Sequence, residues 1–191
     1  DGIRDYKVTG VQTCALPIYP NDRYRAYNIY YPSNGYGTAM FEDLWPSMGD
    51  FNDLVINGRM KMVTNAANKV VELTYYIVPK AIGSSLKNGF AVQFDGISSS
   101  AAYSVTRSRT CGSLFTLAAN GGEQGQAKLN IPFFSAANDI LVNTTGTSGV
   151  NINPNVAFIK PDTLTTTITF MQNGVTENNQ PSYTEIGRAH V

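Results

Sequence analysis

The sequence predicts an all-β fold, an antiparallel β-sandwich. Short apolar runs alternate with polar residues at period two, and no helical 3.6-residue stripe of useful length occurs. The runs are rich in β-branched and aromatic residues, which is typical of strands. Turn-forming stretches separate them: "PSNGYG", "NAAN", "NGG" and "TTGTSG". Many short strands at this spacing indicate a sandwich.

Four segments carry the strand pattern, at residues 23–31, 68–78, 89–94 and 163–170. In 68–78 the apolar face runs from Val71 to Ile77 at every second position, and in 163–170 apolar residues alternate with threonines. The polar stretch 143–155 separates the last two of these strands, and we expect it to be an exposed loop.

Length and composition fit a single packed domain. The chain has 191 residues, of which 42% are hydrophobic and 11% aromatic. Its 14 basic and 14 acidic residues balance, so no basic surplus indicates a nucleic-acid partner. No apolar run approaches the roughly 20 residues that cross a bilayer, so we expect no transmembrane segment.

The two ends do not follow the pattern of the body. Residues 1–18 and 185–191 resemble conceptual translations of the adaptors used in short-read DNA sequencing, and residues 8–18 match an indexing adaptor throughout. The sequence therefore predicts one domain at 19–184, flanked by adaptor-derived artefacts at 1–18 and 185–191. We expect both flanking segments to be disordered or loosely attached.

Without the flanking segments the body contains one cysteine, Cys111, and no histidine. A disulfide within the body is excluded, as are zinc sites built from cysteine and histidine. Ser-His-Asp and Cys-His catalysis are excluded too. The sequence Ser84-Ser85-Leu86-Lys87 formally matches the Ser-x-x-Lys motif of penicillin-recognising enzymes, but no partner motif accompanies it. We therefore expect no enzymatic activity.

One short loop gathers five oxygen-donor side chains around the chain's single tryptophan, Trp45. The five are Glu42, Asp43, Asp50, Asn52 and Asp53. Calcium binds six to eight oxygens of this kind, and crowded carboxylates repel one another unless a cation or backbone donors compensate. The alternative is that Asp50, Asn52 and Asp53 form ordinary side-chain-to-backbone turn bonds. A calcium site predicts that the five side chains converge.

The loop sequence "FEDLWPSMGDFNDLVI" resembles the signature of the LruC domain, a bacterial envelope-associated module of undefined biochemical role. "PKAIGSSLKNGFAVQF" at 79–94 resembles the second motif of that family, and "IPFF" at 131–134 is similar to a later one. The resemblance implies a surface-exposed or secreted location in the bacterial envelope. It also implies further strands after residue 184.

Related secreted domains with such an acidic loop are taken to be calcium-binding β-sandwiches, so the resemblance also implies Ca²⁺ at these five residues. The loop here is two residues shorter than the usual family loop and lacks one carboxylate. We therefore expect weak affinity, since the number of charged ligands tunes calcium binding.

Two functions remain open. The first is a non-enzymatic, calcium-stabilised surface module for adhesion or display, whose partner is an unknown surface ligand, glycan or protein. The second is a carbohydrate-binding module with structural calcium, in which Trp45 and the tyrosines stack on sugar rings. A planar, solvent-facing row of Tyr or Trp on one sheet would favour the sugar, and its absence would favour adhesion.

Overall fold

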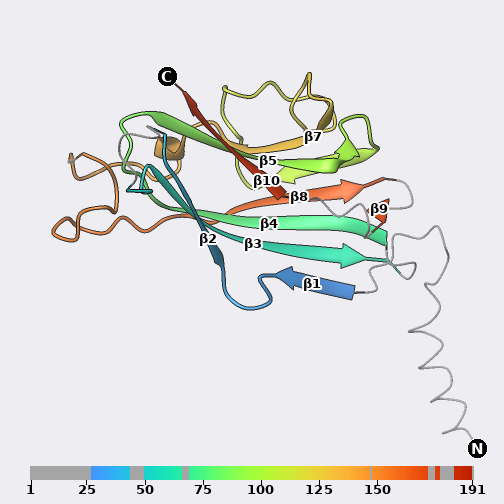
Figure 1. Cartoon of the computed structure of the whole chain (residues 1–191), viewed down its shortest axis with the longest axis horizontal. Coiled ribbons are helices and arrows are strands. Elements are labelled where there is room, and N and C mark those ends of the chain that lie inside the picture. Colours follow the sequence, from blue (N-terminus) through green and yellow to red (C-terminus); the bar gives the residue numbers. More distant parts are fainter. Residues whose placement is uncertain are drawn as a thin grey trace, which may run out of the picture.

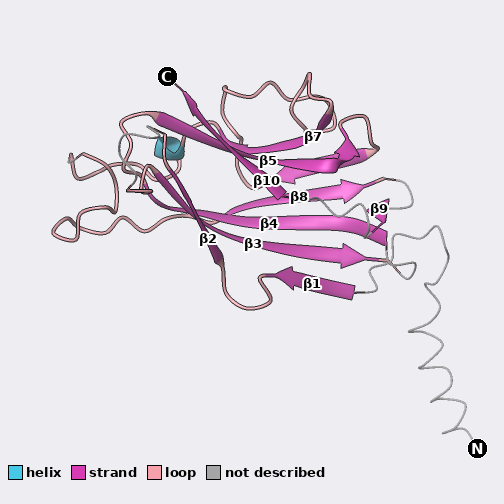
Figure 2. Ribbon diagram, viewed as in Figure 1, coloured by secondary structure: helices cyan, strands magenta, loops and turns pink. Residues whose placement is uncertain are grey.

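The computed structural model describes residues 27–43, 50–65, 69–146, 148–171, 175–176 and 183–190, with the backbone alone for residue 27 and for the last two ranges. Two antiparallel sheets lie against each other as two layers (Figure 1). The described part contains no α-helix and only one short 3₁₀ turn, η1 (Ala137–Asp139) (Figure 2). The prediction of an antiparallel β-sandwich is confirmed.

Among the described residues, the larger sheet has seven strands and the smaller has three. The larger is built from β1 (Tyr27–Tyr31), β2 (Gly37–Phe41), β3 (Leu54–Thr64), β4 (Lys69–Ala81), β6 (Tyr103–Arg107), β8 (Leu164–Phe170) and β9 (Val175–Thr176). Its order is β1-β3-β4-β8-β6; β2 also pairs with β3, and β9 with β4. In the smaller sheet, β5 (Lys87–Ser98) lies between β7 (Lys128–Phe134) and β10 (Tyr183–His190).

The predicted alternation is clearest in β8, where every second residue is buried, from Leu164 to Phe170. In β4 the predicted inner residues are buried as well, but so are Glu72 and Thr74 on the other face. This strand lies between β3 and β8, and its Glu72 forms an ion pair with Lys61 at 3.4 Å. Strand β4 can therefore be buried on both faces, because its polar side chains find polar partners.

An aromatic cluster joins the two sheets. Tyr75 of β4 meets Phe94 of β5 and Phe133 of β7 edge-on, with ring centroids 6.2 and 5.4 Å apart. Edge-to-face pairs add about 0.5–1.5 kcal/mol to the free energy of burial. The sheets are thus held together by a continuous apolar core rather than by a covalent link; the described Cys111 is a free thiol.

The C-terminal segment differs from its prediction. We expected residues 185–191 to be disordered or loosely attached, yet β10 pairs with β5 in continuous register from Tyr183↔Phe94 to His190↔Lys87. The expectation is wrong for the backbone. The physical reason is that the second edge of β5 offers N–H and C=O groups that an extended segment of almost any sequence can pair with. The adaptor origin of the ends stays a prediction, and residues 1–18 lie outside the described residues.

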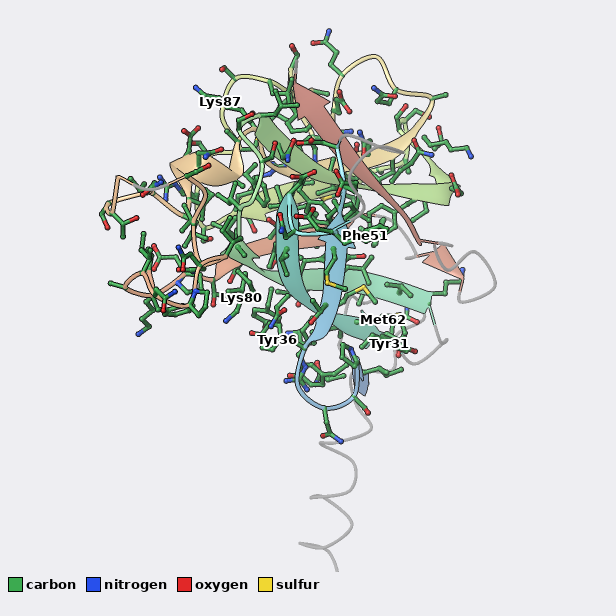
Figure 3. All side chains as sticks on the ribbon, turned by 60° about the vertical axis from the view of Figure 1, so that its left-hand side comes forward. Tyr31, Tyr36, Phe51, Met62, Lys80 and Lys87 are labelled. Atoms are coloured by element: carbon green, nitrogen blue, oxygen red, sulfur yellow. The ribbon has the colours of Figure 1, made fainter. Side chains whose placement is uncertain are left out.

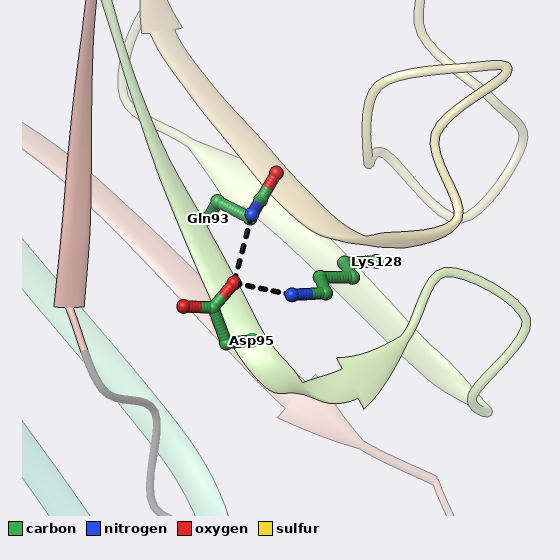
Figure 4. Close-up of polar contacts among 3 residues, drawn as sticks. All are labelled: Gln93, Asp95 and Lys128. Carbon is green, nitrogen blue, oxygen red and sulfur yellow. Dashed lines mark hydrogen bonds and ion pairs between the residues drawn. The ribbon is translucent and has the colours of Figure 1, made fainter.

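A surface ion pair marks the irregular end of the small sheet. The β5–β7 register shifts between Phe94 and Ser98, and Asp95 lies in this interval. Its carboxylate accepts hydrogen bonds from Gln93 Nε2 and Lys128 Nζ, each at 2.8 Å (Figure 4). The pair is partly exposed, so its contribution to stability is at most about 1 kcal/mol.

The predicted loop at 143–155 contains no strand in its described part, although it is fixed in place. Asn151 donates through Nδ2 to the carbonyls of Lys80 and Ile159, at 3.0 and 2.8 Å, and accepts the Ile159 N–H at 2.8 Å. Val150 also forms a bridge with Ile82, just after β4. Across the residues that the structure describes, no helix is long and apolar enough to cross a membrane.

Candidate metal centre

Three acidic side chains converge at the two ends of the loop between β2 and β3. Phe41, the last residue of β2, is paired with Leu54, the first residue of β3, so the two ends of the loop lie side by side. One carboxylate oxygen from each of Glu42, Asp43 and Asp53 lies within 4.8 Å of the others. Residues 44–49, including Trp45, lie outside the described residues.

Backbone donors help to hold this triad of Glu42, Asp43 and Asp53. The Asp43 N–H donates to Asp53 Oδ2 at 2.8 Å, and the Phe51 N–H donates to Glu42 Oε2 at 3.3 Å. Phe51 has a φ of 50°, in the left-handed region that non-glycine residues rarely adopt. Phe51 adopts this conformation at the position where its amide contacts the Glu42 carboxylate.

The other two predicted donors are arranged differently. Asp50 is exposed and its Oδ2 accepts a hydrogen bond from Asn52 Nδ2 at 2.7 Å. Asp50 does not belong to the acidic group formed by Glu42, Asp43 and Asp53. The structure therefore brings three of the five predicted side chains together. Asp50 and Asn52 instead bond to each other through their side chains, which is not the side-chain-to-backbone bond of the alternative interpretation.

A second segment of the chain, between β4 and the start of β5, completes the site. The Gly83 N–H donates to the Asn52 carbonyl at 2.8 Å. A side chain at Gly83 would collide with the Asn52 amide and lie 2.9 Å from its backbone oxygen, so the close approach requires glycine. Ser84 Oγ and Asn88 Nδ2 both donate to Asp43 Oδ2, the latter at 3.1 Å.

Ser84 and Asn88 were not predicted to belong to the site, although the sequence carried a signal for them. Both belong to the second LruC-like motif at 79–94. The structure brings this motif against the first one, so residues about 40 positions apart share one cluster. Two segments that resemble motifs of one family could have been expected to meet.

Two oxygens of the cluster have no hydrogen-bond donor among the described residues. They are Asp43 Oδ1 and Asn88 Oδ1, and both atoms are buried. The Asn88 side chain as a whole is 5% exposed. A buried acceptor without a partner costs about 1–3 kcal/mol. Carboxylate and amide oxygens are also the ligands that Ca²⁺ prefers, so these residues fit a calcium ion.

Burial raises the pKa of Asp53 to about 6. This value already includes the neighbouring carboxyls of Glu42 and Asp43, which raise the pKa, and the hydrogen bond from the Asp43 amide, which lowers it. Asp53 is 8% exposed, and within the described ranges neither Asp43 nor Asp53 forms an ion pair with a basic side chain. Close like charges cost about 1 kcal/mol or more per pair near a surface, and a divalent cation would offset that cost.

Two arginines, Arg107 and Arg109, are bonded to the backbone of neighbouring segments. The Arg107 guanidinium donates to the carbonyls of Pro132, at 3.0 Å, and Gly121, at 2.6 Å. Burial lowers the pKa of this guanidinium. Arg109 donates to the Asp139 carbonyl at 2.8 Å. Both side chains thus bond to backbone oxygens of neighbouring segments.

The model of a protein family described as a domain of unknown function (DUF4842) matches residues 68–185, more than half of the chain, and the chain belongs to this family. No curated protein and no solved structure matches the chain. The matched region contains Ser84 and Asn88, whereas Glu42, Asp43 and Asp53 precede it.

Proposed function

We propose that this member of the DUF4842 family is a non-enzymatic, calcium-stabilised module of the bacterial cell envelope, surface-exposed or secreted, that serves adhesion or display. The observation that carries the proposal is the triad of Glu42, Asp43 and Asp53, with ligand oxygens within 4.8 Å of one another. Calcium is the favoured ion because every candidate ligand is a hard oxygen.

The stabilising role follows from where the triad lies. Asp43 and Asp53 close the β2–β3 loop; of their neighbours, Ser84 lies in the approach to β5 and Asn88 in β5 itself. An ion bound here would add a polar link between segments that the core already joins through Phe41 and Phe90, whose ring centroids lie 5.9 Å apart. The residues on both sides of this contact lie in the two LruC-like motifs. The resemblance of these motifs to an envelope-associated domain supports the envelope location.

Limited proteolysis tests the stabilising role. We expect the protein in several millimolar Ca²⁺ to be cleaved more slowly than in a chelator, because binding to the native state lowers the population of open forms. Asp53→Asn keeps an oxygen that can accept the Asp43 N–H, but it removes the charge, so this variant should be cleaved at one rate in both conditions. Equal cleavage rates for the wild type would remove the support for calcium stabilisation.

Carbohydrate binding is the second candidate, and one groove favours it. A cavity of about 470 Å³ borders β1 and β2 and is lined by Tyr31, Thr38, Met40 and Arg59, among others. Three tyrosines near it are exposed: Tyr30 (37%), Tyr31 (44%) and Tyr36 (44%). Figure 3 shows Tyr31 and Tyr36 beside the connection between β1 and β2, far from Lys87 at the start of β5.

The arrangement of these rings argues against a sugar platform. Tyr30 and Tyr31 are consecutive in a strand, so their side chains point to opposite faces of the sheet. The Tyr30 ring also stacks under the Arg59 guanidinium, 4.4 Å from its centroid. The described tyrosines of this edge therefore do not form a planar row on one face, and adhesion or display remains the leading proposal.

A glycan array decides between the two candidates. Under the leading proposal no glycan is retained in a manner that depends on Tyr31 or Tyr36. Binding that Tyr31→Ala or Tyr36→Ala abolishes, while Tyr76→Ala on β4 leaves it intact, would reverse the order of the two proposals.

A further inference from the structure

We infer that Asn88 is a further ligand of the same cation, through its Oδ1, and that the ion thereby links the two sheets. This inference rests on the proposed calcium site and adds a residue that lies outside the acidic loop. The triad belongs to the loop between β2 and β3 of the seven-stranded sheet, whereas Asn88 belongs to β5 of the three-stranded sheet.

The contacts of Asn88 place its amide in the cluster. Its Nδ2 donates to Asp43 Oδ2 at 3.1 Å and lies 3.5 Å from the Asp53 carbonyl oxygen. The amide oxygen is bonded to the same carbon as this nitrogen, so it lies within a few ångströms of the Asp43 carboxylate. It is buried and has no hydrogen-bond donor in the described part of the chain. Asn130 also has a buried Oδ1 without a described donor while its Nδ2 donates to Glu123. The oxygen of Asn88 points to a cation because this amide adjoins the three converging carboxylates.

Asp43 supplies an independent indication. Its Oδ2 accepts from both Ser84 and Asn88, while its buried Oδ1 has no donor among the described residues. Two buried oxygens, one from each sheet's side of the contact, thus lack partners in the same small region. Native structures leave few such atoms unsatisfied, and a bound ion is one of the recognised explanations.

The backbone around Asn88 is fixed, as a ligand position requires. The next residue, Gly89, passes so close to β7 that a Cβ there would lie 2.9 Å from the Ser135 carbonyl oxygen and from Leu114 Cδ2. On the other side, Gly83 docks on the Asn52 carbonyl. The segment between the two glycines therefore holds Asn88 against Asp43 before any ion binds.

Terbium luminescence tests the inference, because lifetimes in H₂O and D₂O count the water molecules bound to the ion. Tb³⁺ takes oxygen ligands as Ca²⁺ does. We expect Asn88→Ala to add about one water to the bound ion, since the ion keeps its coordination number when a protein ligand is lost. Ser84→Ala is the matched control: it removes the other donor to Asp43 but no proposed ligand, and should leave the water count unchanged.

The outcomes separate the inference from the proposed function. Unchanged hydration in Asn88→Ala, with normal Tb³⁺ binding by the wild type, would overturn the role of Asn88 and leave the triad standing. A wild type that binds neither Tb³⁺ nor Ca²⁺ would overturn the calcium site itself.

Asn88→Asp keeps the inference testable if the alanine variant does not fold. A carboxylate at this position keeps the ligand oxygen and adds charge, so we expect the wild-type water count and a calcium affinity at least about tenfold higher. Added water on the ion, or calcium binding no tighter than that of the wild type, would contradict the assignment.

Discussion

Two carboxylate sites on the same molecule differ in whether the chain itself supplies a positive charge. Asp95, on the small sheet, accepts from one amide and from Lys128 Nζ at 2.8 Å, so the chain itself supplies the cation. Asp43 accepts from Asn88 and Ser84, and neither it nor Asp53 meets a basic side chain in the described ranges. The partners of a carboxylate and its burial therefore distinguish a candidate metal site from an ordinary ion pair better than the number of acidic residues does.

The largest effect that we expect concerns the close contact between Gly83 and Asn52, beside the acidic site. Gly83→Ala places a methyl group against Asn52, including its backbone oxygen, so the loop or the approach to β5 must move. We expect a loss of about 2–4 kcal/mol in the free energy of unfolding, measured by urea denaturation. Gly37→Ala, where the new atom meets only ordinary contacts at 3.8 and 4.0 Å, should change stability by no more than about 0.5 kcal/mol. Equal effects would mean that the Gly83 contact is not tight.

The second effect concerns the charge of the cluster. Asp53→Asn should abolish the rise in melting temperature that Ca²⁺ produces, because one of the proposed ligand charges is lost. Without calcium the variant should be as stable as the wild type or more so, since a buried charge beside Asp43 is removed while an acceptor for the Asp43 N–H remains. Differential scanning calorimetry with and without Ca²⁺ measures both. A full calcium response in this variant would exclude Asp53 as a ligand.

The third effect is on pH dependence. The pKa of Asp53 in the folded protein, about 6, lies above its ordinary value of 3.8, so the native state binds this proton more tightly than the unfolded state. In a chelator, the contribution of Asp53 to stability should therefore rise as the pH falls from above 6 towards 4. Calcium binding requires the carboxylate, so the calcium-induced shift should be large at pH 7.5 and small at pH 5.

Thermal melts at the two pH values, with Asp53→Asn as the control, separate Asp53 from the other titrating groups. Without calcium, the difference in melting temperature between the wild type and Asp53→Asn should be smaller at pH 5 than at pH 7.5. A difference that does not depend on pH would show that Asp53 has an ordinary pKa.

The smallest effect is expected at the other site of the comparison. Asp95→Asn removes an ion pair that is partly exposed, so the free energy of unfolding should fall by at most about 1 kcal/mol, and less at high salt. Its calcium response should equal that of the wild type. A weakened response in chemical denaturation or melting would place Asp95 in the calcium site and remove the contrast between the two regions.

Local patterns allowed the fold class to be predicted, because alternation is a property of neighbouring residues. In β8 the buried positions from Leu164 to Phe170 are those that the pattern indicates. The pairing of β10 with β5 could not be predicted in this way, since it rests on backbone groups at a sheet edge and not on side-chain pattern.

The acidic site was predicted in part for the same reason. Asp43 and Asp53 are close in sequence and on adjoining strand ends, so their convergence follows from one loop. Asn88 is 45 positions from Asp43, and no local pattern shows that they meet. Asp50 has the expected chemistry, but its bond to Asn52 directs it to a local turn.

Thermal melting of the wild type against calcium and magnesium tests the central claim most directly. With a dissociation constant of about 1 mM, tenfold excess Ca²⁺ should stabilise the fold by about 1.4 kcal/mol and raise the melting temperature by about 3–6 °C. The rise should continue with the logarithm of the calcium concentration, and equal Mg²⁺ should produce little of it, because Mg²⁺ gives up its water ligands reluctantly. No shift at several millimolar Ca²⁺, or the same shift with both ions, would contradict a specific calcium site formed by Glu42, Asp43 and Asp53.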